Sequence, residues 1–205
     1  MRNIVIVTLI CLATNSVLAD EAAKIAVLEN RVQQLEKRLA ALETSTAPLL
    51  EKVAAEKRVN QQRLKARERM RKDSKIYTKE QRQEIEKLYQ VANRKWRTDE
   101  GKESLEKLIK NFDKANRTGC ALLYLGQMSQ GLQRENYLQR AIADFSDCYY
   151  GDGVQVGPYA RFYLAYHYKE KKKEKQAADL FKEIATKYPD AIDHKGKLLS
   201  EIIKR

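Results

Sequence analysis

The sequence predicts an all-α protein in which a coiled-coil helix precedes a domain of repeated helical hairpins. Three observations support this prediction. The first third of the chain has a heptad pattern of apolar residues, and the remainder repeats a pattern of paired amphipathic helices. The 205 residues include only eight glycines and three prolines, and no stretch alternates apolar and polar residues as a half-buried strand would.

The segment 158–190 shows the repeating unit most clearly. Its first helix has an apolar stripe that consists of Leu164, Ala165 and Tyr168. Its second helix has a matching stripe that consists of Ala177, Phe181 and Ile184. Pro189 ends the second helix, because a proline pushes the preceding residue toward extended geometry. One hairpin of this kind leaves its apolar face exposed, so several copies are needed to form a core.

The same pattern occurs in two earlier copies. The step from the first-helix leucine to an apolar residue of the second helix is 17 residues in each copy, from 164 to 181, from 125 to 142 and from 88 to 105. For the middle copy a second register, which uses Ala141 and Phe145, also fits. The predicted repeats span 78–113, 119–150 and 158–189, within a domain that covers residues 77–205.

Both ends of this domain have terminal signals. Residues Thr78 to Gln81 resemble a capping box, which predicts the start of the first repeat. At the other end, the apolar residues of the segment 191–205 fall on one helical face, which predicts a capping helix over the last exposed core. These residues are Ile192, Leu198, Leu199, Ile202 and Ile203.

A parallel coiled coil is predicted over residues 20–44. Its apolar positions alternate steps of three and four residues and are Ile25, Leu28, Val32, Leu35, Leu39 and Leu42. The flanking positions are charged, with Arg31 and Arg38 on one side of the stripe and Glu36 and Glu43 on the other. In a parallel assembly each arginine meets a glutamate of its neighbour, whereas an antiparallel pair brings like charges together.

Two oligomeric states fit this coiled coil. The segments RVQQLE (31–36) and RLAALE (38–43) resemble a trimer-favouring pattern of short coiled coils, in which the arginine stem lies along the core. Isoleucine and valine at the first core position with leucine at the second also suit two strands. We expect a homotrimer, with a dimer as the alternative.

Residues 45–76 are predicted to form a basic helical linker. Between positions 57 and 75 there are nine basic residues against Glu68 and Asp73. One interpretation is contact with an anionic surface such as lipid or cell wall, made by Lys65, Arg67, Arg69, Arg71 and Lys72. The other is a solvated spacer. Within this linker Pro48 predicts either the start of a new helix or a kink.

Residues 1–19 have the features of a secretory signal peptide. A short apolar run follows Arg2, and small residues precede an expected cleavage site after Ala19, with an uncleaved anchor as the alternative. The protein is therefore expected to be periplasmic or secreted. Its formal charge of +12 then favours anionic lipid, cell-wall carboxylates or acidic proteins as partners, and nucleic acid is not expected.

Two cysteines, Cys120 and Cys148, remain after the expected cleavage. One opens the first helix of the middle repeat and the other follows its second helix, and these two ends lie together in a hairpin. In an oxidising compartment this arrangement predicts a disulfide, with two buried thiols as the alternative.

The sequence contains no pattern typical of an enzyme. Its two histidines, His167 and His194, lack metal-ligand spacing to a cysteine or carboxylate, and there is no phosphate-binding loop or nucleophile elbow. We expect neither catalysis nor a cofactor.

The hairpins resemble the tetratricopeptide repeat. The residues that carry this resemblance are GQ at 126–127, ADLF at 178–181 and KYPD at 187–190. The resemblance implies an α-α superhelix whose concave wall is built by the first helix of each repeat. It places a peptide-binding groove at Tyr124, Gln127, Tyr159, Phe162, Tyr163, Tyr166 and Lys169. The alternative is that these aromatic residues only pack successive hairpins together.

The combination of export signal, trimer-like coiled coil, polar linker and terminal repeats resembles the YbgF/CpoB family of periplasmic proteins associated with the Tol-Pal system. That resemblance implies a non-enzymatic scaffold that helps to coordinate outer-membrane constriction with cell-wall synthesis in division, through TolA and a penicillin-binding protein. The basic linker, the degenerate first repeat and the two cysteines depart from the family pattern. The alternative function is an envelope-tethered accessory protein of secretion or outer-membrane assembly that uses the basic linker.

Overall fold

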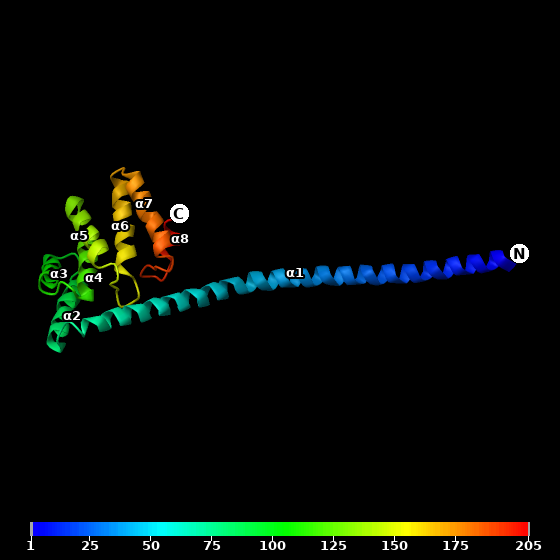
Figure 1. The fold of residues 1–205 in the computed structure, drawn as a ribbon, viewed down its shortest axis with the longest axis horizontal. Helices are drawn as coiled ribbons and strands as arrows, with labels where there is room; N and C mark the ends of the chain where they lie inside the picture. The colour runs from blue at the N-terminus through cyan, green and yellow to red at the C-terminus, as the bar shows by residue number, and fades with distance from the viewer. Residues whose placement is uncertain (1, 205) are drawn as a thin grey trace. The chain divides into compact units, whose positions relative to one another are not determined.

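The computed structural model describes the backbone of residues 2–204 and the side chains of residues 24–204. Within this range the chain forms helices and no strand, which confirms the all-α class. The helices are α1 (Arg2–Asp73), α2 (Lys79–Arg94), α3 (Asp99–Asn111), α4 (Asn116–Met128), α5 (Gly131–Asp144), α6 (Val156–Glu170), α7 (Glu174–Lys187) and α8 (Leu199–Ile202) (Figure 1). The predicted signal peptide, residues 1–19, lies outside the described side chains. No described helix is both long enough and apolar enough to cross a membrane.

The chain divides into two compact units, Met1–Val53 and Ala54–Arg205. The first unit is the N-terminal part of α1, and its described side chains are all exposed. No new helix begins at Pro48, so that predicted alternative is wrong. The Thr44 and Thr46 hydroxyls donate 2.8 Å hydrogen bonds to carbonyls one turn earlier, which keeps these polar side chains compatible with a helix.

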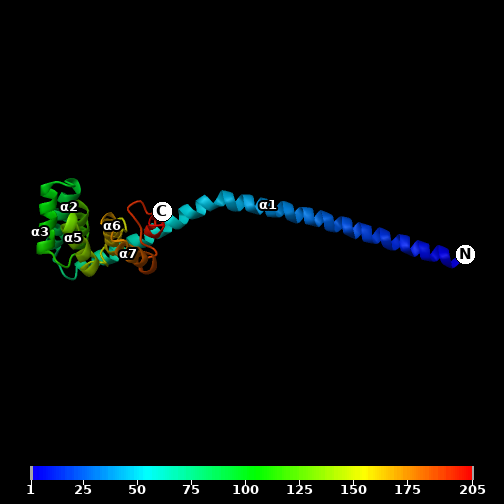
Figure 2. The same cartoon turned by 90° about the horizontal axis from the view of Figure 1, so that it is seen from above.

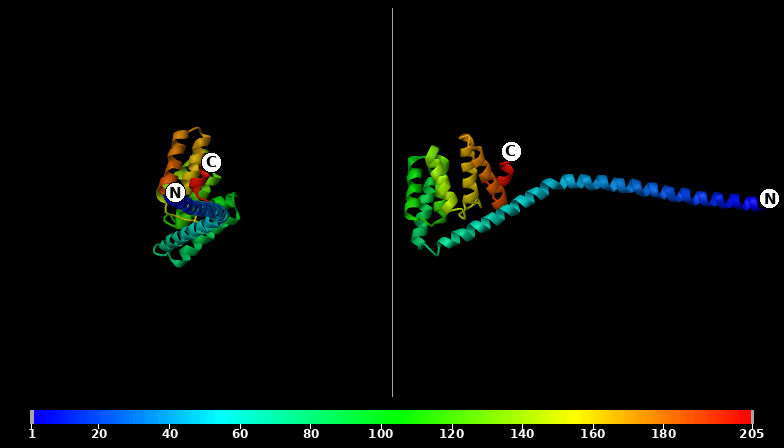
Figure 3. Two further views of the ribbon diagram at one scale, coloured as in Figure 1. Left: turned by 90° about the vertical axis from the view of Figure 1, so that its right-hand side faces the viewer. Right: turned by 45° about the horizontal axis from the view of Figure 1, so that its top comes forward.

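The second unit contains three successive helical hairpins, α2–α3, α4–α5 and α6–α7 (Figure 3). Successive hairpins make contact through α3 with α4 and through α5 with α6. In addition α4 contacts both α2 and α6, so the first helix of the middle hairpin lies beside the first helices of the other two hairpins. Figure 2 shows α2, α3 and α5 toward one end of this unit and α6 and α7 toward the other.

The predicted apolar stripes form the core of the hairpins. In the last hairpin Leu164, Ala165 and Tyr168 are buried together with Ala177 and Ile184. Removing aliphatic side chains of this size from water contributes roughly 1.5–3 kcal/mol each. Phe181, the third residue of the predicted second-helix stripe, is only partly buried and packs against this core.

The middle hairpin favours the second of the two predicted registers. Ala141 is fully buried, whereas Ile142 only packs against the edge of the core. Gly126, the small residue of α4, lies in close contact with Leu138 of α5. A Cβ atom at Gly126 would be 2.6 Å from Leu138 Cδ2, a separation that no side chain tolerates without displacement.

The C-terminal part of α1 belongs to the second unit and is not a solvated spacer. Gln62, Ala66 and Asp73 lie on one helical face and are buried. The Gln62 side-chain amide donates a 2.9 Å hydrogen bond to the Asp190 carbonyl, beyond the last hairpin. The repeat-containing unit thus begins more than twenty residues before the predicted boundary at 77.

Asp73 joins the end of α1 to the start of α4. Its Oδ2 atom accepts a 2.9 Å hydrogen bond from the backbone N–H of Asn116, and its Oδ1 atom accepts a 2.8 Å hydrogen bond from Arg69. The residue before α4 is Ala115, which has no side-chain acceptor of its own. Asp73 therefore supplies from another helix the acceptor that a capping residue normally provides.

The ends of the repeat domain agree only partly with expectation. The capping box is present, because Thr78 and Gln81 each accept a hydrogen bond from the other's backbone N–H. The predicted capping helix over 191–205 is wrong in extent, since only α8 is helical. The Asp193 side chain accepts hydrogen bonds from the N–H groups of Lys195 and Lys197, and these local bonds favour a turn over a helix.

We expect Asp73→Ala to lower the free energy of unfolding by about 2–3 kcal/mol, because it leaves the buried N–H of Asn116 without a partner and removes one of the two carboxylates that pair with the Arg69 guanidinium. Urea denaturation followed by circular dichroism measures this. Glu68→Ala, which removes an exposed carboxylate from the same helix, is the matched control and should change stability by less than about 0.5 kcal/mol. Equal stability of the two variants would contradict the role of Asp73.

Candidate functional site

The predicted groove residues of α6 form a continuous aromatic row. Phe162 lies 5.8 Å from Tyr163 and 4.8 Å from Tyr166 between ring centroids. Phe162 and Tyr163 are half-buried, and Tyr166 is 37% exposed. Tyr159, the first member of the predicted set, is instead buried at the base of this row and stacks on Phe162. It belongs to the support of the surface and not to the surface itself.

Tyr124, on α4, lies 5.8 Å from the Tyr150 ring and is held by contacts with α2 and the turn after it. Its hydroxyl donates a 2.6 Å hydrogen bond to Asn93 Oδ1 on α2, and its ring lies 4.7 Å from the Trp96 ring. Trp96 is 37% exposed and is a surface residue that the sequence interpretation missed. Trp96 is the only tryptophan of the chain, and this rarity is the sequence feature that could have marked it as a candidate binding residue.

The base of the row is a second aromatic cluster. The His194 ring lies 5.1 Å from Tyr150 and 5.3 Å from Tyr159, and its Nδ1 atom is 2.7 Å from Asp152 Oδ2. Burial acts to raise the pKa of Asp152, but the hydrogen bond and the charge of His194 outweigh it and the net pKa is lowered. This pair holds the turn after α7 against the turn before α6. No nucleophilic side chain is hydrogen-bonded to it among the described residues.

A hollow of about 460 Å³ lies beside the exposed end of the aromatic row. It is lined by Arg97, Gln127, Arg134, Phe162, Tyr163, Tyr166, His167 and Glu170. Four of the seven predicted groove residues therefore share one hollow, with Gln127 on α4 and the three aromatic residues on α6. Lys169 lies outside it, with its Nζ atom 5.9 Å from the centre of the Tyr166 ring.

His167 lies at the back of this hollow and is 4% exposed. Burial lowers its pKa, and the positive charges of Lys171 and Arg134 lower it further, so the imidazole is neutral at pH 7. Next to it Glu135 accepts a 2.9 Å hydrogen bond from the Tyr168 hydroxyl. These contacts fix the wall of the hollow formed by α5 and α6.

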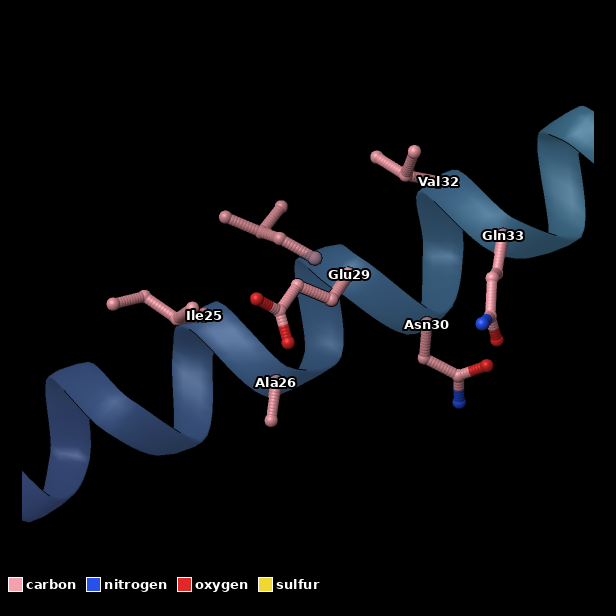
Figure 4. Close-up of a pocket in the computed structure, with 7 residues that line it drawn as sticks. Ile25, Ala26, Glu29, Asn30, Val32 and Gln33 are labelled. Atoms are coloured by element: carbon pink, nitrogen blue, oxygen red, sulfur yellow. The ribbon is translucent and has the colours of Figure 1, made fainter.

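The second candidate surface is the apolar stripe of α1. The six predicted coiled-coil residues are each more than half exposed, so they form an apolar stripe that is open to solvent. Figure 4 shows Ile25 and Val32 on one side of the helix and Ala26, Asn30 and Gln33 on the other. The exposed apolar residues continue past the predicted end at 44, through Leu49 and Val53, in the same register.

The basic residues of the linker separate into two groups. Lys65, Arg67 and Arg71 are exposed, as the anionic-surface interpretation requires, and Lys72 makes only a 3.9 Å ion pair with Asp147. Arg69 is different, because its guanidinium is packed in the domain. Its Nε atom lies 3.0 Å from Asp147 Oδ2, and its other contacts are to Asp73 and the Lys114 carbonyl. Arg69 therefore stabilises the domain, and its predicted contact with an anionic surface is not supported by its position.

The predicted disulfide is absent, since Cys120 and Cys148 are free thiols. The residue of α4 that directly faces Cys148 is Gly119, where a Cβ atom would lie 2.8 Å from Cys148 Cβ. Cys120, one position further round the helix, lies 3.4 Å from the Tyr149 carbonyl oxygen. Burial raises the pKa of Cys120 to about 12 and also raises the pKa of Cys148, so both thiols are protonated at neutral pH.

Among the described residues no three or more His, Cys, Asp and Glu side chains gather as metal ligands would. In comparisons with known proteins, no family model, no curated protein and no solved structure matches this chain.

Proposed function

We propose that this protein is an exported, non-enzymatic scaffold that binds peptide segments of envelope proteins on the surface formed by its first helices. The observation that carries this proposal is the partly exposed aromatic row of α6, formed by Phe162, Tyr163 and Tyr166. Tyrosine and phenylalanine rings supply large contact area at low cost in side-chain entropy, and they are enriched where proteins bind each other. The hairpin stacking and the tetratricopeptide resemblance support reading this wall as concave.

The coiled coil is proposed to make the scaffold a parallel homotrimer, with a dimer as the alternative. An exposed apolar stripe of this length on a solvated helix is unfavourable unless another helix covers it. Several copies of one weak peptide site on a single assembly then bind a multivalent partner by avidity. The YbgF/CpoB resemblance would place such a scaffold in the coordination of envelope constriction during division.

The groove proposal predicts that partner capture depends on Tyr163 and Tyr166. A photo-reactive amino acid at position 166 should form adducts with a small set of envelope proteins in living cells. Tyr163→Ala should reduce these adducts about thirtyfold, since an anchoring aromatic residue of an interface contributes roughly 2 kcal/mol. The control is the same photo-reactive group at Ala185, which is exposed on α7. Identical adducts from both positions would contradict the groove.

The coiled-coil proposal predicts that Leu35→Asp makes the protein monomeric. Each chain of the assembly would then bury a carboxylate in the seam, at a cost of several kcal/mol. Sedimentation equilibrium measures the change, with the exposed Gln33→Asp on the opposite side of α1 as the control. A wild-type chain that stays monomeric at high concentration, or a Leu35→Asp variant that assembles like the control, would rule the coiled coil out.

An envelope-tethered accessory role is the second candidate, and the exposure of Lys65, Arg67 and Arg71 favours it. Neutralising these three residues to Gln should abolish co-sedimentation with phosphatidylglycerol vesicles, and salt should weaken the wild-type binding because exposed charges are screened. The charge-matched control neutralises Lys175, Lys182 and Lys195, which are exposed in the C-terminal part of the domain. Equal loss in both variants would indicate a response to net charge and would reject a defined tethering face.

A further inference from the structure

Two neighbouring hollows share three residues, Arg97, Gln127 and Arg134. The first is the hollow beside the aromatic row described above. The second, of about 500 Å³, lies between the α2–α3 turn and the start of α5. Two arginines therefore line both hollows, and Tyr163 and Tyr166 line the first of them as well. Because both guanidinium groups are positively charged, they favour an anionic ligand.

The guanidinium of Arg97 has no acidic partner among residues 24–204. Its Cζ atom lies 5.6 Å from the centre of the Trp96 ring, a contact that orients the side chain without neutralising it. The backbone of Arg97 has φ 63°, in the left-handed region that glycine adopts most easily. The position therefore keeps a charged side chain where the backbone alone would favour glycine.

Arg134 is held mainly by a backbone carbonyl. Its Nε atom donates a 2.8 Å hydrogen bond to the Ser129 carbonyl, which leaves the outer guanidinium nitrogens for other acceptors. Glu170 Oε2 is 3.8 Å from Arg134 Nη1, but the Glu170 side chain is 68% exposed and forms only this long contact. An exposed ion pair of this length contributes little and is readily exchanged for a better-placed carboxylate.

The hollow is also lined by His167, which has a ring nitrogen without a hydrogen-bond partner. His167 Nε2 is buried, and the Glu135 Oε2 atom lies 3.8 Å away, beyond hydrogen-bonding distance. A buried polar atom without a partner is costly, and a ligand that supplies an acceptor removes that cost. His167, Arg97 and Arg134 line the same hollow and all can donate hydrogen bonds.

We propose that this hollow binds the carboxylate of an acidic side chain in a partner peptide, with an apolar neighbour of that residue packed on Tyr163 and Tyr166. This inference rests on the proposed peptide-binding function and adds the ligand chemistry. Two arginines offset by Glu170 leave one net positive charge in the hollow, which suits a carboxylate better than a dianionic phosphate. Arginine pairs bind carboxylates with directional, often bidentate, hydrogen bonds.

The test uses the full chain as bait for a random 12-residue phage-displayed peptide library, followed by synthesis of the enriched peptides and of copies in which each Asp or Glu is replaced by Asn or Gln. We expect enriched peptides to pair an acidic with an aromatic or large aliphatic residue. Fluorescence polarisation should show about tenfold weaker binding for the amide copies. Selected peptides without an acidic residue, or equal affinity of acid and amide copies, would overturn the assignment.

Three variants test whether the peptide carboxylate binds in this hollow. Arg134→Gln and Arg97→Gly should each weaken acidic-peptide binding about tenfold and leave the weak binding of the amide copies unchanged. Glycine suits the Arg97 backbone, so unfolding does not explain a loss in that variant. Glu170→Gln should tighten binding two- to threefold, because it removes a competing carboxylate. Lys182→Gln, on α7, is the matched control. Unchanged affinity in both arginine variants would exclude this hollow.

The outcomes separate this inference from the proposed function. Peptides that depend on Tyr163 and Tyr166 but are insensitive to both arginines would leave the groove in place and reject the carboxylate site. A library that yields no binding peptide at all would count against both. Inorganic phosphate that displaces the peptide at equal concentration would show a simple anion site and reject the peptide carboxylate as its ligand.

Discussion

The carboxylate of Asp73 connects the C-terminal end of α1 to the start of α4 within the repeat-containing unit. It accepts hydrogen bonds from Arg69 and from the first N–H group of α4. The side chain at the start of α4, Asn116, in turn donates to the Tyr149 carbonyl and accepts from the Tyr149 N–H, at 2.7 and 2.8 Å. The start of one hairpin helix, the end of α1 and the turn before α6 are thereby fixed by one buried polar network. Both carboxylate oxygens of Asp73, the side-chain amide of Asn116 and the backbone groups of Tyr149 each have a partner here, which a buried polar network needs in order to be stabilising.

The aromatic surface follows from this arrangement. The turn after Tyr149 leads into α6, which carries Phe162, Tyr163 and Tyr166, and the same turn supplies Tyr150 and Asp152 to the base of the row. Below the exposed rings, Tyr150 and Tyr159 are buried and pack against His194. Partly exposed rings that pack on a buried aromatic base lose little entropy on binding, which suits a surface that recognises peptides.

Charge is distributed unevenly between the candidate surfaces. In the C-terminal part of α1, Lys65, Arg67 and Arg71 are exposed, so any contact that they make with an anionic surface is sensitive to salt. In the hollow beside α6 the two arginines are oriented, one by a tryptophan ring and one by a backbone carbonyl. Fixed donors of this kind favour a ligand of defined shape and charge. The two surfaces therefore suit different partners.

The sequence by itself determined the helical class, the positions of the three hairpins and the apolar stripes, because these depend on local periodicity and on a repeated step between helices. It also indicated the exposed stripe of α1, and the tetratricopeptide resemblance indicated most of the aromatic row. It did not determine which basic residues are free, because the burial of Arg69 depends on Asp147, far away in the chain.

Only the tertiary structure decided the remaining features. It placed Gly119 opposite Cys148, whereas spacing alone suggested Cys120 as the disulfide partner. It also brought Arg97, from one hairpin turn, to the same hollow as Arg134 and His167 from two other helices. Packing between distant segments decides how each helix is rotated about its axis and which turns of different hairpins meet. A periodic sequence pattern contains no information about that packing.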